Sequence, residues 1–181
     1  AIKQQLLDLN EDINWYPKHL KHGRFRYNVE NAPDWNISRN RYWAASLPVW
    51  KSQKGEIHVI GSVKELQQLA VSEVPDDVDL HKHVVDDIVI KSPKTGDEMR
   101  RIPEVFDCWF ESGSMPYGAN HYPFENKDPV EHHFPADFIS EYIAQTRTWF
   151  YYMHVISTFM MHKPAFTNVV VTGTVLASDG S

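Results

Sequence analysis

The sequence predicts an α/β fold with a small α+β subdomain inserted into it, on three observations. Residues 134–172 show a strand pattern, a helical pattern and a second strand pattern in succession, which is the order of a βαβ unit. Residues 51–103 contain short β-like runs, one helical stretch and polar turns. The length of 181 residues allows one well-formed core, so one domain with an insertion fits better than two full domains.

The first part of the chain is expected to be helical and then irregular. Ile2, Leu6 and Ile13 fall on roughly one face of a predicted amphipathic helix. The basic segment 18–26 that follows is interpreted as a solvated connector. Residues 34–50 are rich in Trp and Arg, which suits a packed loop leading to a strand.

The inserted subdomain and the final part have clearer patterns. Within the insertion we expect strands over residues 57–60 and 88–90 and a helix over residues 63–69. Beyond it we expect a strand over residues 134–139, a helix beginning near Glu141, and a β-branched strand over residues 168–172 of the kind that parallel sheets bury. The chain thus divides into residues 1–33, 34–50, the inserted subdomain 51–103, and the α/β part 104–181.

Composition narrows the class of protein. The hydrophobic fraction of 42% is too high for a disordered chain, and no window approaches the ~18 apolar residues of a membrane span. The single cysteine, Cys108, cannot form an internal disulfide, which favours a cytoplasmic protein. A net charge of -6 argues against wrapping nucleic acid by charge alone. The first residue is not Met and the last residues, 177–181, form a polar turn, so we expect a piece of a larger protein.

One candidate site follows from the end of a predicted strand. Ligands bind open parallel sheets beyond the carboxyl ends of the strands. A helix that begins near Glu141 would place Glu141, Gln145 and Trp149 on one face. A carboxylate, an amide and an indole in one crevice could bind the ammonium, the polar backbone and the apolar side chain of an amino acid. The alternative is a Glu that favours the helix dipole, an exposed Gln and a core Trp.

Other clusters give weaker signals. Asp107 and Glu111 are candidate paired carboxylates, but nothing fixes their distance. Cys108 lies between aromatic residues and is interpreted as an inert, buried thiol. His81 and His83 would share one face of a strand, yet zinc normally takes three or four ligands, and no zinc or phosphate-loop motif occurs.

Four ordered motifs resemble one family. Asp34–Trp43 with Leu47–Trp50 resembles a signature of the large class I aminoacyl-tRNA synthetases, at the return from the editing insertion to the catalytic core. Val105–Pro116 narrows the resemblance to isoleucyl-tRNA synthetases, and the segments Gln145–Tyr151 and Asn168–Gly180 agree with it.

The resemblance implies the second half of a Rossmann-like nucleotide-binding domain. Residues 1–33 would be the connector from the editing insertion, and residues 34–50 would be a segment of the catalytic core. The chain would belong to an enzyme that activates isoleucine with ATP and Mg²⁺ and transfers it to tRNA. By position, the resemblance assigns the isoleucine side chain to Trp109 and Trp149, the aminoacyl-adenylate to Glu141 and Gln145, and its nucleotide part to Thr172 and Gly173.

The resemblance also sets limits on this chain. The HIGH motif is absent and the sequence ends where a KMSKS-like loop should follow, so the chain alone is expected to be inactive. Some relatives carry zinc knuckles where this chain has Ser52 and Ser92–Thr95, so no zinc is expected. The intact protein is expected to be a monomer that does not bind membranes.

A second interpretation stays open. Tyr142 and Thr148 stand where the family usually has Gly, and Ala144 stands where it usually has an Asp that holds the ribose. The alternative is therefore a catalytically inactive, synthetase-derived module that binds tRNA or protein. An unrelated soluble α/β domain is disfavoured, because four motifs occur in the family's order.

Overall fold

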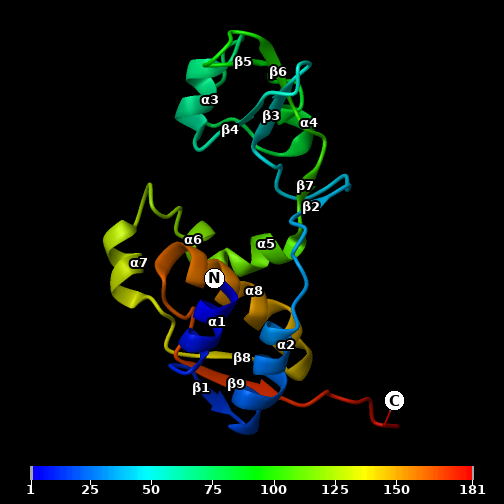
Figure 1. The fold of residues 1–181 in the computed structure, drawn as a ribbon, viewed down its shortest axis with the longest axis vertical. Helices are drawn as coiled ribbons and strands as arrows, with labels where there is room; N and C mark the ends of the chain where they lie inside the picture. The colour runs from blue at the N-terminus through cyan, green and yellow to red at the C-terminus, as the bar shows by residue number, and fades with distance from the viewer. Residues whose placement is uncertain (1, 181) are drawn as a thin grey trace. The chain divides into compact units, whose positions relative to one another are not determined.

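The computed structural model describes residues 2–180, which form two units (Figure 1). Unit 1 is built from Ala1–Trp35 and Trp109–Ser181, and unit 2 from Asn36–Cys108. Unit 2 therefore extends beyond the predicted insertion at both ends. The reason is a short antiparallel pair, since β2 (Ser38–Arg39) pairs with β7 (Val105–Phe106) and joins the segments on either side of the insertion.

Unit 1 contains a three-stranded parallel sheet, which confirms the α/β prediction. β1 (Asn14–Tyr16), β9 (Asn168–Thr172) and β8 (Ile139–Tyr142) lie in the order β1-β9-β8. β9 covers the residues predicted for it. The strand predicted over residues 134–139 is wrong, because regular pairing begins only at Ile139. Pro135 has no N–H to donate, and before Ile139 there is a single bridge between Ala136 and Phe166.

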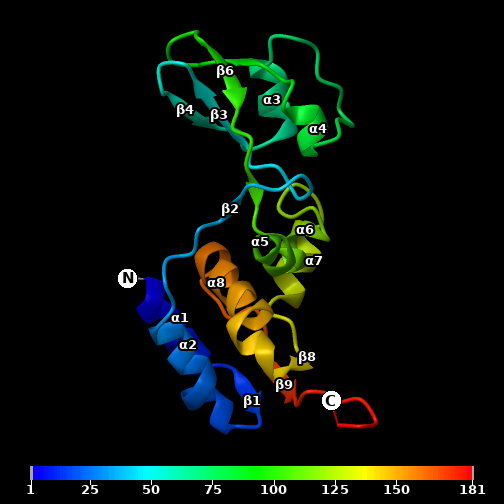
Figure 2. The ribbon, with the colours of Figure 1, turned by 90° about the vertical axis from the view of Figure 1, so that its right-hand side faces the viewer.

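Helices cover one face of this sheet. Its buried row is formed by the paired residues Trp15, Val169 and Ile139, while Tyr16 and Ser140 on the opposite face are exposed. Figure 2 shows α1, α2 and α8 side by side. The unit contains α1 (Ile2–Asn10), a π-helix (Lys21–Phe25) that continues into α2 (Arg26–Glu30), α5 (Cys108–Gly113), α6 (Met115–Gly118), α7 (Lys127–His133), a 3-10 helix (Ile143–Arg147) and α8 (Trp149–Met161).

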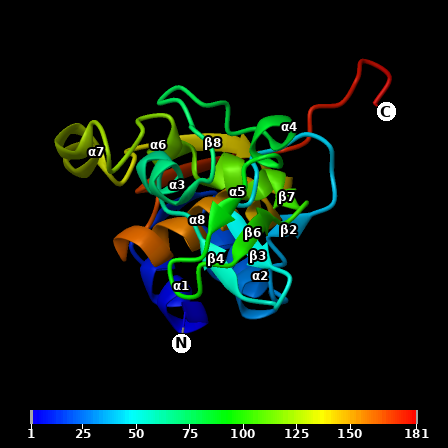
Figure 3. The ribbon, with the colours of Figure 1, turned by 90° about the horizontal axis from the view of Figure 1, so that it is seen from above.

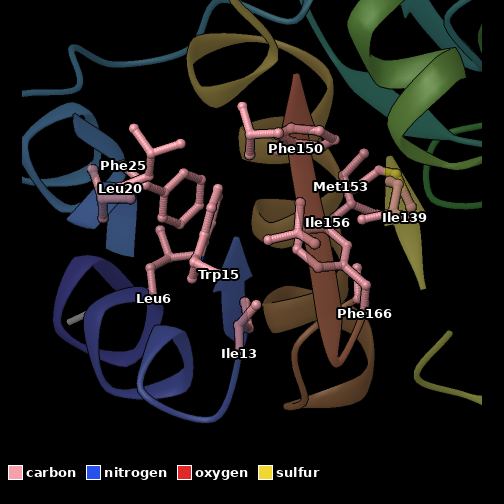
Figure 4. Packing of buried hydrophobic residues seen from close by; sticks show 14 of the residues in the cluster. Leu6, Ile13, Trp15, Leu20, Phe25, Ile139, Phe150, Met153, Ile156 and Phe166 are labelled. Carbon is pink, nitrogen blue, oxygen red and sulfur yellow. The ribbon is translucent and has the colours of Figure 1, made fainter. Parts of the chain in front are cut away.

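The core of unit 1 is aromatic. Figure 4 shows Trp15 and Phe25 pointing toward one another, with ring centroids 4.6 Å apart, and Phe150 meets Trp15 edge-on at 6.2 Å. The buried indole N–H of Trp15 donates to Asn10 Oδ1 at 2.9 Å, so its burial leaves no polar group unpaired. Elements at the periphery extend outward: α7 lies beyond α6, and the segment after β9 leads away from the sheet (Figure 3).

Unit 2 is an antiparallel sheet with two helices. β4 (Ile57–Val59), β3 (Val49–Ser52), β6 (Glu98–Arg101) and β5 (Ile90–Lys91) lie in that order. α3 (Val63–Leu69) spans the predicted residues, because Ser62 Oγ accepts from Glu65 N at 3.1 Å and caps it. The strand predicted over residues 88–90 lies instead at Ile90–Lys91.

The histidine pair of unit 2 lies at a helix. The prediction that His81 and His83 share one face of a strand is wrong, since α4 (Lys82–Val85) begins directly after His81. Asp79 Oδ1 lies 2.6 Å from His81 Nδ1 and also accepts from the His81 backbone N–H. This Asx-type contact at the helix start outweighs the alternating pattern on which the strand prediction rested.

His154 joins α8 to α1 inside the core. Its side chain is fully buried, and its Nε2–H donates to the carbonyl oxygen of Leu6 at 2.8 Å. Phe25 packs against the imidazole edge-on at 5.7 Å. Burial lowers the pKa of His154 to about 4, because the charged form would lose its hydration.

We predict that His154 makes unit 1 sensitive to acid. Its pKa is about 4 in the fold and about 6.5 in an unfolded chain, so the unfolded state takes up a proton first as the pH falls below 6.5. The free energy of unfolding should therefore fall between pH 6.5 and 4, by roughly 3 kcal/mol in total. Urea unfolding of this chain across that range, compared with His154→Gln, measures the effect.

Glutamine keeps an N–H donor for Leu6 but does not titrate. The control is His19→Gln, which removes an exposed imidazole. Equal pH dependence in the parent chain and the His154→Gln variant would contradict the prediction.

Candidate functional site

The carboxyl ends of β8 and β9 meet at one edge of the sheet. Tyr142 and Thr172 are paired as the last residues of the two strands, and Gly173 follows directly. All three are exposed, and a Cβ built on Gly173 meets no atom within 4 Å. This edge is where ligands bind to open parallel sheets, and Gly173 leaves its backbone accessible there.

Glu141 lies at this edge but not on a helix. The expectation that Glu141, Gln145 and Trp149 share one face of a helix is wrong, because β8 continues through Tyr142 and a 3-10 helix separates it from α8. Glu141 pairs with Val171 in the sheet, which holds its backbone extended. Its exposed carboxylate accepts the backbone N–H of Tyr142 at 2.8 Å.

Gln145 caps α8 instead of lying exposed. Its Oε1 accepts from the backbone N–H of Trp149 at 3.0 Å and from Thr148 Oγ1 at 2.5 Å. The first N–H groups of a helix have no partner within the helix, so this amide oxygen satisfies one of them. The amide nitrogen of Gln145 is left to donate to a ligand.

Trp149 is held at its backbone and at its ring. Besides the cap from Gln145, its indole Nε1–H donates to the carbonyl oxygen of Ser112, at the end of α5, at 3.1 Å. The half-buried ring lines an apolar cavity of about 290 Å³. The other walls of the cavity include Met115, Phe134, Ile139, Met153 and Phe166. A space of this kind suits an aliphatic side chain.

Trp109 does not line this cavity. It lies half-buried on α5 and stacks on Tyr152, with centroids 5.8 Å apart and planes 12° from parallel. Tyr152 follows Trp149 on α8, so both tryptophans pack along the first turns of that helix. The role of Trp109 as a second wall for the amino acid stays a prediction.

In the cluster around residue 107, Asp107 has a structural role. Asp107 is buried and forms an ion pair with Arg39 at 2.8 Å. The interpretation of Cys108 as a buried thiol is wrong, because Cys108 is exposed. It is the first residue of α5, which turns its side chain to the surface although both neighbours in sequence are aromatic or buried.

Ser52 and Ser92 are buried in unit 2, and both form hydrogen bonds to Glu56. Ser92 Oγ donates to Glu56 Oε1 at 2.6 Å, and Thr95 Oγ1 donates to Glu56 Oε2 at 2.9 Å. These bonds lower the pKa of Glu56. The Ser52 hydroxyl in turn accepts the backbone N–H of Glu56 at 3.1 Å. Across residues 2–180 no three or more His, Cys, Asp or Glu side chains are grouped to hold a metal ion.

Comparisons with known proteins agree over the whole chain. The family model described as tRNA synthetases class I (I, L, M and V) matches residues 1–181. Isoleucine–tRNA ligases from Protochlamydia amoebophila and Chlamydia muridarum are each 52% identical over 180 residues, and that from Chlamydia abortus is 53% identical. Each alignment covers 99% of this chain and 17% of the relative, so the chain spans about a sixth of the relatives' length.

A solved structure shares the fold. The ternary complex described as Agrobacterium radiobacter K84 agnB2 LeuRS-tRNA-LeuAMS matches with a TM-score of 0.58 and 18% identity, over 82% of this chain and 20% of that one. The described part of the chain, residues 2–180, has no helix with the length and apolar character that a membrane crossing requires.

We predict that the protein binds no stoichiometric zinc in unit 2. Ser52, Ser92 and Thr95 are poor zinc ligands, and their hydroxyl groups are already hydrogen-bonded around Glu56. Elemental analysis of the purified protein after dialysis against zinc should give much less than one zinc per chain. About one zinc per chain, lost on His81→Ala, would contradict this and locate a site at the histidines.

Proposed function

The chain belongs to the class I tRNA synthetases of the I, L, M and V group, and from this premise we propose that it is part of an isoleucine–tRNA ligase. The observation that carries the proposal is about 52% identity to isoleucine–tRNA ligases over 180 residues. The apolar cavity beside Trp149 is consistent with a branched aliphatic substrate.

The proposed reaction has two steps without a covalent enzyme intermediate. The carboxylate of isoleucine attacks the α-phosphorus of ATP, and pyrophosphate leaves. A ribose hydroxyl of tRNA then attacks the activated carbonyl, and AMP leaves. This part of the protein contributes by orienting the amino acid and the adenylate, which removes the entropy cost of bringing them together. Mg²⁺ would accompany ATP and spread the phosphate charge.

The site residues have distinct proposed tasks. Glu141 offers a carboxylate at the open strand edge, where it would attract the substrate's ammonium group. Gln145 would donate its amide N–H₂ to a polar oxygen, since its own oxygen already caps α8. Trp149 would line the space for the side chain, and Trp109, which stacks on Tyr152 outside the cavity beside Trp149, is proposed as a second wall. Thr172 and Gly173 would lie beside the nucleotide. A cytoplasmic, monomeric intact protein belongs to the same proposal.

The test is isoleucine-dependent exchange of pyrophosphate into ATP by the intact protein that carries this segment. We expect exchange with isoleucine well above that with leucine or methionine, followed by charging of tRNA. No exchange with any amino acid, in a folded protein that still binds tRNA, would favour the inactive binding module.

We predict that Trp149→Ala in the intact protein weakens isoleucine activation. Truncating an aromatic wall removes apolar contact worth about 3 kcal/mol, which corresponds to a rise in the isoleucine KM of roughly 100-fold. Trp43→Ala, which removes an exposed tryptophan in unit 2, is the control and should leave the KM unchanged. A lower melting temperature with normal exchange kinetics in Trp149→Ala would show that Trp149 is only a core residue.

We predict that Gln145→Glu separates the two tasks of this side chain. A carboxylate oxygen can still accept the Trp149 backbone N–H, so α8 stays capped and the melting temperature should change little. The lost amide donor should cost about 1 to 3 kcal/mol in isoleucine kcat/KM. Gln145→Ala removes both functions and should lower stability as well. Unchanged kinetics in Gln145→Glu would argue against substrate contact.

We predict that the 181-residue chain alone does not catalyse this exchange. It contains neither of the motifs that the family uses to handle phosphates, HIGH and KMSKS. Exchange above background by the purified chain, abolished by Trp149→Ala, would overturn this account.

A further inference from the structure

The end of α5 lies so close to α8 that a Cβ at Gly113 would be crowded. A Cβ placed on Gly113 would lie 2.9 Å from Ile156 Cδ1 and 3.2 Å from the backbone carbonyl carbon and oxygen of Tyr152. The first neighbour is a side-chain end that can move, but the second is helix backbone that cannot move without shifting α8. An alanine at this position would therefore require the Ile156 side chain to move and the α8 backbone to shift by a few tenths of an ångström.

The close approach is linked to a carbonyl group of α5 whose hydrogen-bond donor comes from another helix. In a continuing helix, the carbonyl oxygen of Ser112 would accept from the N–H four residues later, but that residue is Pro116, which has no N–H. The indole Nε1–H of Trp149 donates to this oxygen instead, at 3.1 Å. Ser112 immediately precedes Gly113, so the position of the oxygen depends directly on the fit of Gly113 against α8.

We propose that Gly113 is a positioning residue for the amino-acid pocket. By letting α5 lie against α8, it brings the Ser112 carbonyl oxygen within reach of the Trp149 indole and fixes the ring as a wall of the cavity. Gly113 touches no substrate and acts through Trp149. The proposal rests on the proposed function, because it assigns the cavity beside Trp149 to the amino acid.

The test is Gly113→Ala in the intact protein, with Gly118→Ala as the matched control. Gly118 ends the neighbouring helix α6, and a Cβ there meets nothing within 4 Å. Loss of one hydrogen bond and of the fixed ring should raise the isoleucine KM about three- to tenfold. The ATP KM and kcat should change less than about twofold, and Gly118→Ala should change none of these values.

A double-mutant cycle separates positioning from general damage. Trp149→Phe keeps an aromatic ring but has no N–H to donate, so Gly113→Ala added to Trp149→Phe should raise the isoleucine KM by less than about twofold more. If Gly113→Ala folds poorly, Gly113→Ala with Ile156→Val removes the nearest clash and should recover folded protein with a KM between those of the parent and the single variant.

The outcomes are distinct. An equal effect of Gly113→Ala in the parent and in Trp149→Phe would overturn the proposal, as would equal rises in the isoleucine and ATP KM values.

If the parent protein shows no isoleucine-dependent exchange, the proposed function fails. Intrinsic fluorescence of Trp149, isolated by subtracting the Trp149→Phe spectrum, then tests the positioning separately. The proposal predicts a shift of that spectrum in Gly113→Ala and none in Gly118→Ala.

Discussion

The pairing of β9 with both β1 and β8 is the constraint on which unit 1 depends. β9 is the central strand, and its parallel partners come from opposite ends of the sequence. The register places Trp15, Val169 and Ile139 in one row beneath α1 and α8, so the aromatic core forms only if all three strands are in line. Because side chains alternate along a strand, a shift of one residue would turn that row to the opposite face.

The same register arranges the candidate site. It aligns the ends of β8 and β9 at Tyr142 and Thr172, so the chain leaves the sheet beside Gly173. After Tyr142, at the end of β8, a 3-10 helix turns the chain into α8, whose first residue is Trp149. The two polar contacts on Trp149 come from two different elements, the 3-10 helix and α5. The backbone N–H and the indole N–H of Trp149 are thus both held by neighbouring elements.

The amino-acid sequence predicts correctly those helices and strands whose pattern lies in neighbouring residues. The helix over residues 63–69 and the strand over residues 168–172 have the predicted ends, because a helical pattern and a β-branched run are properties of adjacent residues. Long-range pairing was not predictable: two-residue strands at Ser38 and Val105 extend unit 2 beyond the insertion. The helix predicted to begin near Glu141 rested on its four-residue spacing to Gln145 and Trp149. The residue that pairs with Glu141 in the sheet, Val171, is thirty residues away in sequence, so a local pattern could not reveal it. Sequence motifs predicted Gln145 and Trp149 as site residues, but a backbone carbonyl such as that of Ser112 leaves no pattern of its own. Pro116, which has no N–H to donate four residues after Ser112, is the sequence feature that points to this carbonyl group.

The parallel pair of β1 and β9 also has a consequence for synthesis on the ribosome. Asn14 and Asn168 are paired across 154 positions, and all of unit 2 lies between them. At about 5–20 residues per second, the ribosome needs roughly 8–30 s to make that stretch. Unit 2 is complete and free to fold during this time, while Trp15 and Phe25 have no β9 or α8 to cover them. The aromatic core of unit 1 can therefore close only after the last strand of the sheet has been made, well after unit 2 is complete.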